Sequence, residues 1–185
     1  MSFISRIPEE KGSLGAILKP YPEIATPVSM MTEYVMRSEG VQFSRAEREV
    51  IATFVSDLNA CTFAARTHQA AAEALGVSGT LFDALLDDID ASPVDDKLKP
   101  VLKYVRKLTL TPTRMTQLDV DAIFDAGWDE KSFHFSLMIC GMFNFYNRLL
   151  EGYGIKNTQA FREKAGRGLA ESGYMHVAEN SRANN

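Results

Sequence analysis

Residues 44–76, SRAEREVIATFVSDLNACTFAARTHQAAAEALG, decide the fold. Ser44 and Glu47 form the capping-box pattern that begins an α-helix. Behind them, apolar residues recur at helical spacing: Val50, Ile51, Phe54, Val55 and Leu58. Asn59 is a residue type that caps the start of a helix, and Gly76 is typical of a helix end. The stretch therefore predicts two helices that are hinged near Asn59.

Further helix signals follow one another along the rest of the chain. They predict helices over about 26–40, 80–89, 97–110, 116–127, 129–152 and 158–169. The segment 130–151 is apolar nearly all round, which indicates a central core helix or a helix shared with another subunit. No segment shows the alternation typical of a β-strand. The prediction is an all-α, single-domain fold.

The chain divides into three parts by composition. Residues 1–25 are rich in proline and glycine, and we expect an irregular N-terminal arm. Residues 26–155 carry the predicted helical core. Residues 156–185 hold a last amphipathic helix and, after Gly173, a polar tail.

Composition excludes several classes of function. The net charge is −4 and no element concentrates Lys and Arg, so we expect no nucleic-acid partner. The longest stretch without a charged residue, 132–147, is too short to span a bilayer, and no apolar signal core begins the chain. We therefore expect a cytoplasmic protein. Dispersed histidines and the lack of a glycine-rich phosphate loop predict neither a metal nor another cofactor.

The hinge suggests a reactive site. Glu49 and His68 are each about ten positions from it, so antiparallel helices would bring them together, and the carboxylate would fix the imidazole tautomer. Cys61 falls in the first turn after Asn59, where backbone N–H groups favour a thiolate and a lowered pKa. His68 is two turns, roughly 10 Å, from Cys61, so a water or a substrate atom would have to bridge them.

Each of these residues also has a purely structural interpretation. Cys61 alone is more often a small buried hydrophobe. His68 alone is more often a hydrogen-bonded core histidine, and Glu49 alone is more often a solvated charge on a helix. Only their combination points to chemistry.

The same segment resembles the AhpD-like alkylhydroperoxidases of the carboxymuconolactone decarboxylase superfamily. Their signature is a Glu, a Cys-x-x-Cys twelve residues later, and a His four residues after the second Cys. Glu49, Cys61 and His68 match it. Three further segments are similar to the "peroxidase-related" branch of that family: LKYVRKLT (102–109), DVDAIFDAGWDEKSFH (119–134) and FNFYNRLLEGYG (143–154).

The resemblance implies an AhpD-like helical bundle that assembles as a homo-oligomer, commonly a trimer or a hexamer. It also implies thiols that cycle between dithiol and disulfide, with the Glu and the His as a proton relay. This chain departs from the pattern because Ala64 stands where the family has its second cysteine. The disulfide within the motif cannot form.

Three functions follow from this departure. The first is a peroxidase in which Cys61 attacks a small hydroperoxide, His68 and Glu49 move protons, and an external thiol reductant completes the cycle. Cys140 would replace the lost thiol only if it lies within disulfide reach. The second is a non-redox acid–base enzyme of the carboxymuconolactone decarboxylase type, acting on a small carboxylated substrate. The third is a non-catalytic oligomeric scaffold on the same fold.

Overall fold

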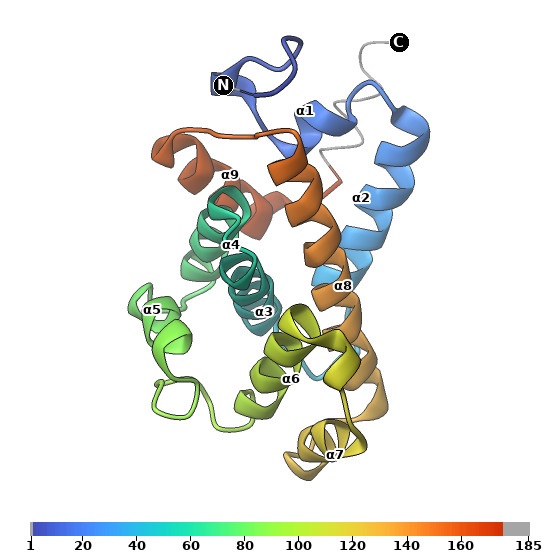
Figure 1. Cartoon of the computed structure of the whole chain (residues 1–185), viewed down its shortest axis with the longest axis vertical. Coiled ribbons are helices and arrows are strands. Elements are labelled where there is room, and N and C mark those ends of the chain that lie inside the picture. The colour runs from blue at the N-terminus through green and yellow to red at the C-terminus, as the bar shows by residue number, and fades with distance from the viewer. Residues whose placement is uncertain (1, 176–185) are drawn as a thin grey trace.

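Residues 2–175 are described by the computed structural model of the chain, and the regular elements within this range are all helices (Figure 1). The prediction of an all-α fold is confirmed. The α-helices are α1 (Leu14–Leu18), α2 (Pro22–Arg37), α3 (Arg45–Leu58), α4 (Thr62–Ala74), α5 (Thr80–Asp87), α6 (Lys99–Leu110), α7 (Gln117–Asp125), α8 (Glu130–Gly152) and α9 (Gln159–Ser172). Two short 3₁₀ helices are η1 (Glu9–Lys11) and η2 (Pro112–Arg114). No helix in the described range is long and apolar enough to cross a membrane.

Helix α3 is the central element of the bundle. It begins at the predicted capping box, where Ser44 Oγ accepts from the Glu47 amide at 3.1 Å and Glu47 Oε2 accepts from the Ser44 amide at 2.7 Å. Residues 48–56 are then buried without a break, because α4, α5, α6 and α8 pack around α3 (Figure 1). A helix buried on every side positions its polar residues inside the protein, and Glu49 is one of them.

The hinge lies one to two residues later than the sequence predicted. Asn59 ends α3 instead of capping α4, since its Nδ2 donates to Val55 O at 3.0 Å and to Asn144 Oδ1 on α8 at 3.1 Å. Ala60 has a left-handed backbone (φ +54°), and Cys61 is the N-cap residue of α4. The turn is tight, so α4 folds back directly along α3.

The N-terminal part differs from the irregular arm that we expected over residues 1–25. Ser13 caps a short helix, α1, by accepting from the Ala16 amide at 3.1 Å, and Ile17 and Leu18 anchor that helix in the core. Helix α2 begins at Pro22, in the first turn where a proline is tolerated, and not at residue 26. The addition that matters is α1, because its Ile17 packs in one apolar cluster with Phe63 and Ala64 of α4.

The C-terminal part also differs from the prediction. Helix α9 runs to Ser172 and packs along α4, and Tyr174, expected in a polar tail, is buried. The remaining part of that predicted tail, residues 176–185, lies outside the described residues.

Small residues allow α9 to lie close against α4. A Cβ added at Gly166 would lie 2.2 Å from Thr67 O and 2.7 Å from the Ala70 Cβ. A backbone oxygen and an alanine methyl group cannot move away from such a contact without a cost in free energy. The glycine therefore sets the spacing of these two helices.

Gly166→Ala is expected to lower the free energy of unfolding by about 1–3 kcal/mol, the usual cost of overpacking. Gly168→Ala is the matched control on the same helix, because its added Cβ would meet no atom within 4 Å. It should raise the free energy of unfolding by about 0.5–1 kcal/mol. Urea denaturation followed by circular dichroism measures both, and equal effects would contradict the close approach of α4 and α9.

Candidate functional site

The hinge brings Glu49 and His68 into contact, as the sequence predicted. Glu49 Oε2 on α3 lies 2.8 Å from His68 Nδ1 on α4. Both side chains are buried, so little water competes for this hydrogen bond. The geometry gives the pair a fixed orientation; a catalytic role for it stays a prediction.

Tyr174 is a third member of this group, and the sequence analysis missed it. Its hydroxyl donates to Glu49 Oε1, and its ring lies nearly parallel to the His68 ring at a centroid distance of 6.2 Å. Burial, together with the neighbouring Glu49 carboxylate, raises the pKa of Tyr174 well above its usual value. The phenol therefore keeps its proton and acts as a donor.

An ion pair on α2 holds Tyr174 in place. Glu33 Oε2 accepts from the Tyr174 amide at 2.7 Å, and Glu33 Oε1 lies 3.0 Å from Arg37 Nε. Arg37 Nη1 in turn donates to Leu169 O and Ala170 O, each at 3.1 Å. Helix α2 thus binds the last turn of α9 and the two residues that follow it.

A sequence signal for Tyr174 existed but is weak. Gly173 ends α9 with φ +81°, the left-handed region that favours glycine. An apolar residue after such a glycine commonly packs back on the helix. Nothing local shows that the Tyr174 hydroxyl would reach Glu49, which lies 125 residues earlier.

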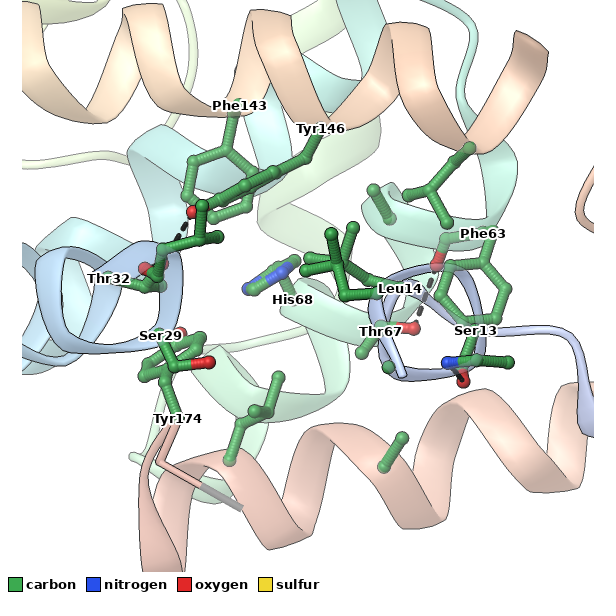
Figure 2. Close-up of a pocket in the computed structure, with 18 of the residues that line it drawn as sticks. Ser13, Leu14, Ser29, Thr32, Phe63, Thr67, His68, Phe143, Tyr146 and Tyr174 are labelled. Carbon is green, nitrogen blue, oxygen red and sulfur yellow. Dashed lines mark hydrogen bonds between the residues drawn. The ribbon is translucent and has the colours of Figure 1, made fainter. Parts of the chain in front are cut away.

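The hydrogen-bond pattern determines which His68 nitrogen is basic. Glu49 accepts from the Tyr174 hydroxyl at one oxygen and faces His68 Nδ1 with the other. A carboxylate accepts only, so Nδ1 carries the proton and neutral His68 has its lone pair on Nε2. Within residues 2–175 no hydrogen-bond partner contacts Nε2. His68 extends into a pocket, where the edge of Phe143 packs on its ring at a centroid distance of 4.5 Å (Figure 2).

The pocket has a volume of about 360 Å³, within the size range of small-molecule sites. Helices α1, α2, α4, α8 and α9 form its walls. Only α1 was not predicted from the sequence, and it contributes Leu14 and Leu18 to the wall. Most lining side chains are apolar. Of the described residues that line it, only His68 and the exposed Lys19 are basic, and none is acidic. No cluster of side chains suited to a metal ion occurs within residues 2–175.

Cys61 does not belong to this pocket. Its thiol is fully buried in a small apolar cluster with Ile7, Ile17, Leu150 and Ile155. The pKa of Cys61 is raised to about 12, chiefly by burial and also by the Glu151 carboxylate, and the backbone N–H groups of α4 offset only part of this rise. The predicted thiolate is therefore wrong, because the cost of desolvation exceeds the effect of the helix N-terminus.

The residue that does face the pocket is Ala64, one turn after Cys61. The family resemblance places the second thiol at this position. In this structure, position 64 thus opens onto the cavity and Cys61 lies away from it.

Cys140 lies in the main core on α8. Its Sγ is 3.4 Å from Thr109 Oγ1 and 3.5 Å from Asn144 Nδ2, and burial raises the pKa of this thiol also. Both cysteines are free.

The raised pKa of Cys61 predicts slow alkylation. At pH 8 a thiol with a pKa near 12 is ionised about a thousandfold less than one with the ordinary pKa of 9.0. Because the shift is upward, reactivity should rise with pH and level off only near pH 12. Iodoacetamide labelling followed by peptide mass spectrometry measures this, with the guanidinium-unfolded protein as control. Labelling of native Cys61 that levels off below pH 8 would contradict the structure.

Neither a known protein family nor a curated protein matches the sequence of this chain. Solved structures do match its fold. One is an uncharacterized peroxidase-related protein from Silicibacter sp. TM1040, with a TM-score of 0.75, 22% identity, and coverage of 85% of this chain and 81% of that one. Another is an uncharacterized peroxidase-related protein from Ralstonia eutropha JMP134, described as an alkylhydroperoxidase AhpD core. It has a TM-score of 0.72 and 17% identity, covering 82% of this chain and 79% of that one. The chain has the AhpD-like helical fold of these peroxidase-related proteins.

Proposed function

We propose that this chain is a cytoplasmic member of the carboxymuconolactone decarboxylase superfamily that works as a non-redox acid–base enzyme. One observation carries the proposal. His68 is held at Nδ1 by a buried carboxylate, and it extends into a pocket that no thiol lines. An oriented imidazole in an apolar cavity is equipped to move protons.

In this proposal His68 is the catalytic residue. Nε2 takes a proton from a substrate bound in the pocket, and the resulting imidazolium is stabilised by Glu49. Tyr174 acts as a positioning residue, since its hydroxyl holds the Glu49 oxygen that faces away from the histidine. The lining is mainly apolar and holds no acidic described residue, so the product is the group placed to take the proton back from His68.

The second candidate is a one-cysteine hydroperoxide reductase, which the fold shared with peroxidase-related proteins favours. It would need Cys61 as a thiolate, a hydroperoxide that reaches it, and an external thiol to reduce the sulfenate. Full burial and a pKa near 12 oppose the first two requirements. We therefore rank this candidate below acid–base chemistry.

We also propose a homo-oligomer. Large apolar side chains remain exposed on α2 and α8, with Met30 at 58%, Tyr34 at 61% and Phe145 at 45%. Exposed apolar groups of this size are typical of interaction surfaces. The family resemblance suggests a trimer or a hexamer. A monomer in sedimentation velocity at micromolar concentration would contradict this proposal.

The two candidate functions separate in one experiment with His68→Gln and Cys61→Ala. The first substrate is a small lactone that bears a carboxylate group, and the second is the methyl ester of the same lactone. The third is cumene hydroperoxide, supplied with dithiothreitol as the reductant. Lactone turnover should fall about 10²–10⁴-fold in His68→Gln, the usual contribution of general acid–base catalysis, and stay within about twofold in Cys61→Ala. Hydroperoxide consumption that requires Cys61 would overturn the proposal. If the wild type turned over no substrate, the scaffold function would be the better interpretation.

Tyr174→Phe is expected to lower kcat about tenfold and leave KM nearly unchanged, since the phenol positions Glu49 and makes one hydrogen bond to it. The measurement is steady-state kinetics on the lactone. Tyr146→Phe, on α8, is the matched loss of a buried pocket phenol that bonds to Thr32 and not to Glu49. A loss in kcat equal to that of Tyr146→Phe would show that Tyr174 does not position the carboxylate.

A further inference from the structure

The pocket has two chemically different ends (Figure 2). On one side of His68, hydroxyl groups gather from α2, α8 and the residue after Gly173: Ser29, Thr32, Tyr146 and Tyr174. On the other side lie Leu14 and Phe63. Of the hydroxyls near that second end, Thr67 Oγ1 donates to Phe63 O at 2.8 Å. Ser13 Oγ accepts from the Ala16 amide and is partly exposed, so water can take its hydrogen.

Most hydroxyl hydrogens at the polar end are also committed. Tyr174 donates to Glu49. Thr32 Oγ1 donates to Val28 O at 2.7 Å, so in its 2.5 Å contact with the Tyr146 hydroxyl the tyrosine is the donor. Neither Thr32 nor Tyr146 therefore has a hydrogen left for a ligand.

Ser29 is different. Its side chain is on α2 and points into the pocket (Figure 2). Only 3% of the residue is exposed, and within residues 2–175 its Oγ has no hydrogen-bond partner. Buried hydroxyls in folded proteins are nearly always bonded, so an unpaired one that faces a cavity calls for an explanation. A ligand atom that accepts a hydrogen bond provides one.

We propose that Ser29 donates a hydrogen bond to a carbonyl oxygen of the substrate and is a specificity-determining residue. The substrate class is a mainly apolar carbonyl compound, such as a ketone, an ester or a lactone. This inference rests on the proposed function for its chemistry. It extends that function by stating which group of the substrate lies beside His68.

The lack of a positive charge at the polar end of the pocket favours a neutral carbonyl group of the substrate there over a carboxylate. The polar end consists of hydroxyl groups, and no Lys or Arg among the described lining residues accompanies them. A carboxylate there would be buried without a cation, which is strongly unfavourable. Lys19, which is exposed, is the one lysine among the described residues that line the pocket. A substrate that carries a carboxylate would hold it beside Lys19 and present its neutral carbonyl to Ser29.

The arrangement suits proton abstraction next to the carbonyl. The proton on the neighbouring carbon moves to His68 Nε2, and the C–H electron pair forms a carbon–carbon double bond. The carbonyl oxygen takes the negative charge, and the Ser29 hydroxyl stabilises it. Reprotonation by the imidazolium restores neutral His68. No oxidant or reductant is needed.

Binding of two isosteric probes tests the proposal without requiring turnover. Acetophenone carries a carbonyl, and α-methylstyrene has a CH₂ group in the place of the oxygen. Ser29→Ala should raise the Kd of acetophenone about tenfold, the effect of one lost hydrogen bond, and change that of α-methylstyrene by less than about twofold. Isothermal titration calorimetry measures both, and the ¹³C carbonyl resonance of bound acetophenone should lie further downfield in the wild type than in Ser29→Ala.

Thr67→Val is the matched control, because it removes a pocket hydroxyl whose hydrogen is already used within α4. It should shift both Kd values equally.

Three results with the two probes would overturn the proposal: an equal shift of both Kd values in Ser29→Ala, no shift of either value, or no acetophenone binding at millimolar concentration. Benzoate that binds more tightly than acetophenone and loses that affinity in Ser29→Ala would overturn the neutral carbonyl, because a carboxylate held beside Lys19 would not depend on Ser29. If any of these results accompanied lactone turnover that still depends on His68, only the assignment of Ser29 would fail.

Discussion

The buried carboxylate of Glu49 is the constraint on which the rest of the structure depends. A carboxylate out of water is costly unless hydrogen bonds replace its hydration. Here His68 and Tyr174 supply one each, and they come from helix α4 and from the segment after α9. Three parts of the chain that are distant in sequence must therefore meet at one side chain. The fold satisfies that requirement before any ligand binds.

The surrounding packing can be understood from this requirement. Helix α4 is rich in alanine, and α9 presents Gly166 to it, so the two helices lie close enough for the end of α9 to reach Glu49. The left-handed Gly173 then turns the chain, and the Glu33–Arg37 pair on α2 fixes Tyr174. A larger residue at Gly173 would meet Glu33 Oε2 at 2.4 Å. The positions of α2 and α9 thus also determine the shape of the pocket around His68.

The local parts of this arrangement could be predicted from the sequence, and the non-local parts could not. The capping box at Ser44 and the helix limits of α8 depend on neighbouring residues, and both agree with the structure. The contact between Glu49 and His68 followed from a hinge between two helices. Cys61 was misjudged because its pKa depends on the N-terminal segment that buries it, with Ile7 and Ile17, and no local pattern shows that contact. Tyr174 was missed for the same reason.

The difference between positions 61 and 64 determines which chemistry the pocket supports. A thiol at position 64 would line the same cavity as His68, where a peroxide that entered the cavity could reach it. The cysteine at position 61 has neither advantage, because an apolar cluster encloses it. With Ala64 in the pocket wall, no described lining residue is a thiol, and the hydrogen bonds that orient the histidine do not involve this position. In the acid–base function that we propose, His68 is the proton-transfer group in this cavity, and Ser29 beside it has the hydroxyl hydrogen left to recognise the substrate.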